Sequence, residues 1–213
     1  MARMTEKYAP LRQRMERAGS MEFDFHKCGQ VPNSAGCKLK REPGRQAAAF
    51  TQSLDCLSRE DRELATQAPW FCNFEPDLSR GFRALKVWFA IAGFGTDGLG
   101  AVVTRSCAVA RYLAMRVNAL PWLELMSPVV LNVVCFRVVA LQAYDPDWLN
   151  AELVKDLHES GVAAPSTTKV NGQVVIRAAL VNHRTTEHDV DIMLDTLHSL
   201  ATARQSEGQA GPG

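Results

Sequence analysis

The chain has 213 residues, of which 46% are hydrophobic and 22% charged, with 14 glycines and 10 prolines. This composition is typical of a globular protein and excludes collagen, coiled-coil rods and wholesale disorder. The 24 lysine and arginine residues balance 23 aspartate and glutamate residues, so the formal net charge of +1 gives no reason to expect nucleic acid or an anionic membrane as a partner.

Apolar stretches, the first residues and the cysteines indicate where in the cell the protein is expected. The longest apolar stretches, 85–94 and 128–136, are shorter than the roughly 20 residues that a membrane-spanning helix needs, so we expect no span and no membrane. The first residues lack the apolar segment of a secretory signal, so none is expected. The six cysteines form no CxxC pair and no metal-ligand spacing with histidine. We therefore expect free thiols, no metal site and a cytoplasmic location.

The first third of the chain predicts short elements and a long connection. A helix is expected over 10–18, a strand over 21–27 and a second strand over 35–40. Residues 42–76 are rich in polar residues, proline and glycine, with only a weak helical pattern over 60–66. A connection of this length is usually functional or disordered.

From residue 77 the pattern becomes regular. The order of helices and strands predicts an antiparallel-rich α+β domain, followed by a tail that is too polar to pack. The predicted elements are a helix over 78–92 ended by Gly93 and Gly95, a helix over 96–119, strands over 122–126 and 131–139, a helix over 146–160, strands over 162–168 and 173–181 joined by Asn171-Gly172, and a last helix after Thr186.

Lys27 is the residue most suggestive of chemistry. It follows His26 at the predicted strand end and precedes the turn over 29–32. Partial burial disfavours an ammonium and yields the neutral amine that reacts with a carbonyl, and an adjacent histidine can donate a hydrogen bond to an anion such as phosphate. On spacing alone, however, a His-Lys pair at a strand end is most often a solvated surface pair.

Further motifs accompany Lys27 in a fixed order along the chain. They are Ser20-Met21, Gly29, Val31-Pro32, Ala35 and Arg41 around the lysine, and then the segments 77–89, 132–137, 175–177 and 183–187. From about residue 8 to about residue 203, this order resembles the C-terminal portion of the group II pyridoxal-phosphate-dependent amino-acid decarboxylases, the family of the aromatic-amino-acid and glutamate decarboxylases.

The resemblance implies an α/β fold, namely the C-terminal part of an aspartate-aminotransferase-like (fold type I) enzyme that uses pyridoxal 5'-phosphate. Residues 1–76 would be the lysine-bearing end of a truncated large domain together with the catalytic loop. Residues 77–203 would be helices and the α+β small domain, and 204–213 a disordered tail. Family members act as homodimers with the site at the interface.

The same resemblance implies roles for single residues. Lys27 would be the catalytic lysine that binds the cofactor covalently, and His26 and Asp24 would be further cofactor-binding residues. Asp24 lies where relatives place Asn or Asp near the phosphate, and a carboxylate there needs a proton or a water to approach an anion. Cys56 lies where the mobile loop carries a catalytic tyrosine that helps to return a proton, so a thiol would replace a phenol. Apart from the resemblance, Arg83 and Lys86 are interpreted as a solvated helix face, with a place near the dimer interface as the alternative for Arg83.

The expected function is that of a pyridoxal-phosphate-dependent carboxy-lyase, an amino-acid decarboxylase, in truncated form. The alternative is a non-catalytic remnant, or one half of a split enzyme, that acts as a folding or dimerisation module. The expected partners are an amino-acid substrate and either a second copy or a complementary N-terminal half.

Overall fold

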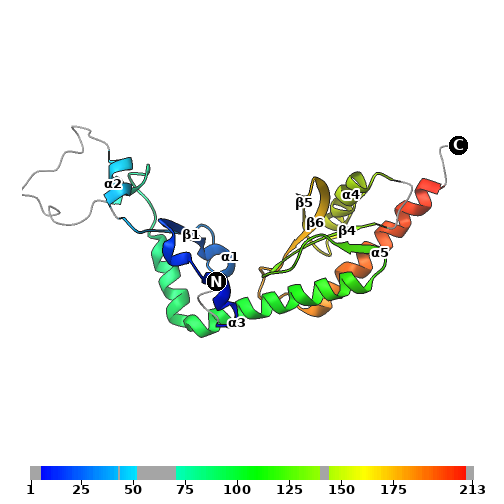
Figure 1. Cartoon of the computed structure of the whole chain (residues 1–213), viewed down its shortest axis with the longest axis horizontal. Coiled ribbons are helices and arrows are strands. Elements are labelled where there is room, and N and C mark those ends of the chain that lie inside the picture. The colour runs from blue at the N-terminus through cyan, green and yellow to red at the C-terminus, as the bar shows by residue number, and fades with distance from the viewer. Residues whose placement is uncertain (1–5, 43, 52–70, 140–143, 210–213) are drawn as a thin grey trace, which may run out of the picture. The chain divides into compact units, whose positions relative to one another are not determined.

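The structure is a computed structural model that describes residues 6–42, 44–51, 71–139 and 144–209 (Figure 1). The chain divides into two compact units, and each is described by itself. Unit 1 is Met1–Thr96 and unit 2 is Asp97–Gly213. The boundary between 76 and 77 that the resemblance implies stays a prediction.

Unit 1 contains a two-stranded antiparallel sheet. β1 (Ser20–Asp24) pairs with β2 (Gly36–Lys40), which confirms both predicted strands. Half-buried and exposed side chains alternate over the first residues of β1, which is the period-two pattern of a strand with one covered face. The strand ends earlier than predicted, because the chain turns into the short helix α1 (Phe25–Cys28). Lys27 therefore lies on a helical turn and not at a strand end.

The other described elements of unit 1 before residue 83 are short. No continuous helix forms over 10–18, because Arg14 adopts a left-handed conformation with φ 75° and separates two 3-10 helices. The helix α2 was not among the predicted elements. These elements are η1 (Glu6–Arg12), η2 (Met15–Arg17), α2 (Gly44–Phe50) and η4 (Phe71–Phe74).

The helix α3 (Arg83–Ala119) crosses the boundary between the two units. Gly95, with φ 66° and ψ 169°, breaks its helical geometry, in agreement with the predicted end of one helix and start of the next. Its first part carries large apolar side chains that are exposed within the chain. Phe82 just before the helix, and Trp88, Phe89 and Phe94 within it, are 60 to 75% exposed.

By length and composition α3 could cross a membrane, which differs from the expectation that no segment is long enough. A core helix of a soluble protein passes the same test. The part before the break, 83–94, would span only about 18 Å, which is less than the hydrocarbon layer of a bilayer. The part after the break places Leu113 and Val117 in the core of unit 2. The helix therefore gives no ground for a membrane location.

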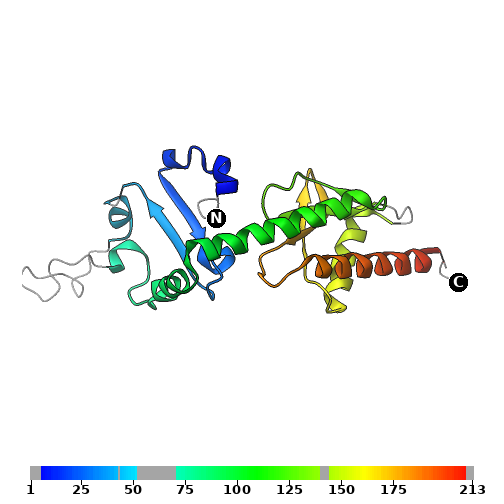
Figure 2. The same cartoon turned by 90° about the horizontal axis from the view of Figure 1, so that it is seen from below.

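Unit 2 is a four-stranded antiparallel sheet in the order β3-β4-β6-β5, packed with α4, α5 and the second part of α3. Figure 2 shows α5 beside this part of α3, where the Tyr112 hydroxyl donates to both Asp191 carboxylate oxygens at 2.9 Å. The elements are β3 (Leu123–Leu125), β4 (Val133–Val138), α4 (Pro146–Glu159), β5 (Ser166–Val170), β6 (Gln173–Ala179) and α5 (Glu187–Gln209).

The turn and cap signals of unit 2 have the predicted effects. Asn171 and Gly172 both have positive φ, 52° and 83°, as a tight turn between β5 and β6 requires. Thr186 and Asp189 form a reciprocal capping pair at the start of α5, in which the Thr186 N–H donates to the Asp189 carboxylate at 2.8 Å. The end of α5 differs from the prediction, because residues 204–209 continue the helix instead of starting the tail.

Asn150 joins β4 to α4 inside unit 2. Its side chain is fully buried, and its Oδ1 accepts a hydrogen bond from the Val138 N–H at 2.9 Å. Its Nδ2 donates to the Val138 and Pro146 carbonyls at 3.1 and 2.8 Å. One amide thus satisfies both backbone groups at the end of the strand and a carbonyl of the first helical turn.

Replacing Asn150 by alanine should lower the free energy of unfolding of unit 2 by about 2 to 3 kcal/mol, because buried backbone groups lose their partners. The measurement is amide hydrogen exchange of β4 and β6 in the full chain under mild denaturant. The control is Asn118→Ala on the exposed face of α3, which should change the same free energy by less than about 0.5 kcal/mol. Equal effects of the two substitutions would contradict a special role for Asn150.

Candidate functional site

Lys27 lies in α1, directly after β1, and its side chain is 63% exposed. Its Nζ forms an ion pair with Asp24 Oδ2 at 2.5 Å, within the same turn. The expected partial burial of this amine is therefore not found within the chain. The ion pair instead favours the ammonium form, so the amine must lose a proton before it can attack a carbonyl.

Asp24 occupies the N-cap position of α1 and is 26% exposed. The hydrogen bond from Lys27, together with the positive charges of Lys27 and His26, holds the pKa of this carboxyl below its ordinary value. Asp24 is thus ionised at neutral pH. An anion beside Asp24 would also meet the Lys27 ammonium, which reduces the repulsion that the sequence led us to expect.

His26 is fixed by a backbone hydrogen bond. The Ala35 N–H donates to His26 Nδ1 at 3.1 Å, which makes Nδ1 the acceptor. In the neutral ring the proton then lies on Nε2, so this nitrogen is a hydrogen-bond donor. The structure thereby gives His26 the donor that an anion site needs, beside Lys27 in sequence and on the same helical turn.

The turn after α1 folds back tightly against it. The Val31 N–H donates to the Phe25 carbonyl at 3.3 Å, and the Phe25 N–H donates to the Ala35 carbonyl at 2.8 Å. Gly29 lies so close to α1 that a Cβ at this position would approach the Phe25 carbonyl oxygen to 2.6 Å. Only glycine fits there without a backbone shift. The sequence motif contains Gly29, but the approach that requires it is visible only in the fold.

Lys86 is the functional candidate that sequence reasoning missed. Its Nζ donates to the carbonyls of Pro32 and Asn33 at 3.0 and 3.3 Å, so it is not merely part of a solvated helix face. These carbonyls lie more than fifty residues earlier in the chain, and no local pattern connects them with α3.

Cys56 lies outside the described residues, so its predicted place in a catalytic loop stays a prediction. Cys37, Cys72, Cys107 and Cys135 are free thiols. Within the part of the chain that the structure describes, no group of three His, Cys, Asp or Glu side chains is arranged to hold a metal ion.

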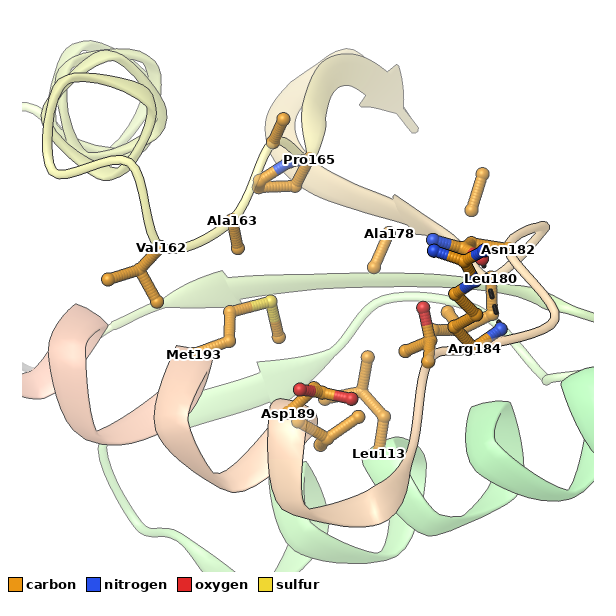
Figure 3. Close-up of a pocket in the computed structure, with 14 residues that line it drawn as sticks. Leu113, Val162, Ala163, Pro165, Ala178, Leu180, Asn182, Arg184, Asp189 and Met193 are labelled. Atoms are coloured by element: carbon orange, nitrogen blue, oxygen red, sulfur yellow. Dashed lines mark hydrogen bonds between the residues drawn. The ribbon is translucent and has the colours of Figure 1, made fainter.

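A pocket of about 520 Å³ lies in unit 2, where the loop over 162–165 faces the start of α5 (Figure 3). Its apolar lining includes Met193 and Leu113, and Arg184 and Asp189 supply charged groups. Lys27 belongs to unit 1 and does not line it. The size of this pocket is therefore no guide to the chemistry of the lysine.

Comparison with known proteins adds a family and a fold. A family model described as "Pyridoxal-dependent decarboxylase conserved domain" matches residues 1–139. The aromatic-L-amino-acid decarboxylase of Bacillus atrophaeus is 29% identical over 203 residues, which are 93% of this chain and 42% of the relative. The L-2,4-diaminobutyrate decarboxylase of Rhizobium meliloti (strain 1021) is 32% identical over 196 residues, which are 91% of this chain and 38% of the relative.

Solved structures agree in fold. The crystal structure of Oryza sativa TDC with PLP and tryptamine matches 96% of this chain and 43% of its own, with a TM-score of 0.84 at 23% sequence identity. This likeness confirms the predicted fold class, the α/β architecture of a fold type I enzyme. The chain spans about two fifths of the length of the relatives that it matches.

The Asp24–Lys27 pair predicts a measurable effect on amine reactivity. Asp24→Asn should make Lys27 react roughly two- to fivefold faster with an acylating reagent at neutral pH. Only the neutral amine reacts, and an exposed ion pair stabilises the ammonium modestly. The pKa of Asp24 is lowered in the folded chain. The ion pair therefore contributes its full stabilisation above the ordinary pKa of aspartate, and this stabilisation is lost as the pH falls through the lowered pKa.

The rate at Lys27 would be followed by peptide mass spectrometry. Glu22→Gln is the matched control, since it removes one exposed carboxylate from the same strand without touching Lys27. An equal rate in the wild type and Asp24→Asn would show that the ion pair does not control the amine.

Proposed function

The chain belongs to the pyridoxal-dependent decarboxylase family, and from this premise we propose that it is the lysine-bearing C-terminal part of a pyridoxal-phosphate-dependent carboxy-lyase that acts on an amino acid. The observation that carries the proposal is the group around α1. Lys27 presents an accessible amine, and His26 and Asp24 flank it on the same short segment.

These residues fit the cofactor in chemistry. The amine of Lys27 can bind the aldehyde covalently once its proton has left to water, which reaches the side chain because it is 63% exposed. His26 can donate from Nε2 to a phosphate oxygen, because Nδ1 already accepts from Ala35. When bound, pyridoxal phosphate supplies an electron sink for the charge that remains on the substrate carbon as carbon dioxide leaves.

A partner chain is part of the proposal. Either a second copy or a complementary N-terminal half would complete the site, since the chain spans about two fifths of its relatives. The aromatic side chains exposed at the start of α3 offer an apolar surface for such a partner. In the described part of unit 1, β1 and β2 pair only with each other, so neither outer edge is hydrogen-bonded to a further strand.

The same two features favour the second candidate function, a folding or dimerisation module without catalysis. The discriminating experiment is turnover of a panel of L-amino acids by the chain alone and by the chain mixed with a separately produced N-terminal segment. Carbon dioxide release in the mixture supports the carboxy-lyase. Stable complex formation without turnover supports the module.

We place the protein in the cytoplasm. The proposal is supported by Cys37, Cys72, Cys107 and Cys135, which are free, as expected in a reducing compartment. Cys107 and Cys135 are buried in unit 2, where oxidation would require exposure of the core.

Incubation with pyridoxal phosphate followed by borohydride reduction should label Lys27 in preference to every other lysine. The amine condenses with the aldehyde with loss of water, and the hydride reduces the resulting carbon–nitrogen double bond. Lys155 is a matched internal control, because it is 65% exposed and pairs with the carboxylate three residues earlier at 2.5 Å, as Lys27 does. Equal labelling of Lys27 and Lys155, or undiminished labelling in Lys27→Arg, would contradict the assignment.

The predicted role of Cys56 has its own test. In the chain combined with the N-terminal segment, Cys56→Tyr should raise the share of amine among the products, because a phenol reaches further than a thiol to return a proton. Cys56→Phe supplies the ring without the hydroxyl and should leave the product ratio unchanged. If both substitutions change the product ratio equally, the side chain at position 56 does not help to return a proton.

A further inference from the structure

Lys86 connects α3 with the turn that follows Lys27. Its Nζ donates to two successive backbone carbonyls, those of Pro32 and Asn33, at 3.0 and 3.3 Å. An exposed lysine usually keeps its ammonium in water, so two backbone acceptors within hydrogen-bond distance mark a specific contact. Charge-assisted hydrogen bonds of this kind are stronger than those between neutral groups.

α1 cannot hold itself in place and depends on the chain at its two ends. A helix of four residues has a single turn, which is not stable in isolation. Its position is therefore set by its two ends. At the first end β1 is held by its pairing with β2, and at the second end the chain enters the turn over 29–35.

The bonds that hold this turn fall into two groups. The Val31 and Ala35 N–H groups bond back to Phe25 and His26, so these contacts are local and move together with α1. The contact of Lys86 is different, since it ties the turn to a long helix outside the local segment. It is thus a contact that fixes the turn relative to α3.

We propose that Lys86 is a positioning residue for Lys27, which it holds in place through the Pro32–Asn33 carbonyls. The proposal rests on the proposed function for what Lys27 does. The contact itself, and its effect on the turn, do not depend on that function.

The first test is amide hydrogen exchange in the full chain. Lys86→Met keeps the length of the side chain and removes the donors, and it should speed exchange of the Val31 and Ala35 amides roughly five- to tenfold. Arg83→Met is the matched control, one turn earlier on the same helix and exposed, and it should leave both amides unchanged. Unchanged exchange in Lys86→Met would overturn the proposal.

The second test separates positioning from mere local stability. The initial rate at which pyridoxal phosphate is captured at Lys27, divided by the rate at Lys155, should fall roughly threefold or more in Lys86→Met. Lys86→Arg, which retains the charge and the donors, should restore both this ratio and the exchange rates. Faster exchange with an unchanged ratio, or failure of arginine to restore the ratio, would also overturn the role.

The two proposals fail in different ways. A wild-type ratio of Lys27 to Lys155 capture no greater than one would contradict the proposed function. The difference in amide exchange of Val31 and Ala35 between Lys86→Met and Arg83→Met would still decide whether Lys86 positions the turn.

Discussion

The antiparallel pairing of β1 with β2 is the constraint on which the geometry at Lys27 depends. Because Asp24 lies opposite Gly36, the chain between them must leave one strand and enter the other within a short distance. It does so with one helical turn and one tight return, closed by the bond from the Phe25 N–H to the Ala35 carbonyl. Lys27 lies in this helical turn, and its ammonium forms an ion pair with Asp24, the last residue of β1.

The two units differ in how much core supports them. The main buried cluster, with Phe136, Ile176 and Leu153 among its fully buried members, lies entirely in unit 2. Unit 1 carries the candidate chemistry on a two-stranded sheet, which is marginal by itself in water. This contrast agrees with the proposal that another chain completes the sheet and the site.

Local patterns predicted the elements that local physics controls. Most strand residues of both sheets and the Asn171-Gly172 turn follow from residue type and spacing, although β5 begins at Ser166 and not at residue 162. The Asp145 carboxylate accepts from the Trp148 N–H, as an N-cap does. The helix expected from residue 78 begins instead at Arg83, after Gly81, a residue that is unfavourable in a helix interior.

The candidate members of the site could be named from the sequence, and their roles stay predictions, but their geometry could not be predicted. The motif identified Lys27, His26 and Asp24 through resemblance. The Asp24–Lys27 pair depends on the chain entering a helix where alternation predicted a strand, and the tautomer of His26 depends on a backbone N–H from the start of the next strand. The contact of Lys86 depends on how α3 packs, and a sequence pattern confined to one helix contains no information about it.

The exposed rings around the start of α3 also have a thermodynamic consequence. Phe82, Trp88, Phe89 and Phe94 keep most of their surface in water within this chain. Transfer of aromatic surface out of water lowers the heat capacity of a system. An association that covers these rings would therefore have a negative heat-capacity change, and its enthalpy would become more favourable as the temperature rises.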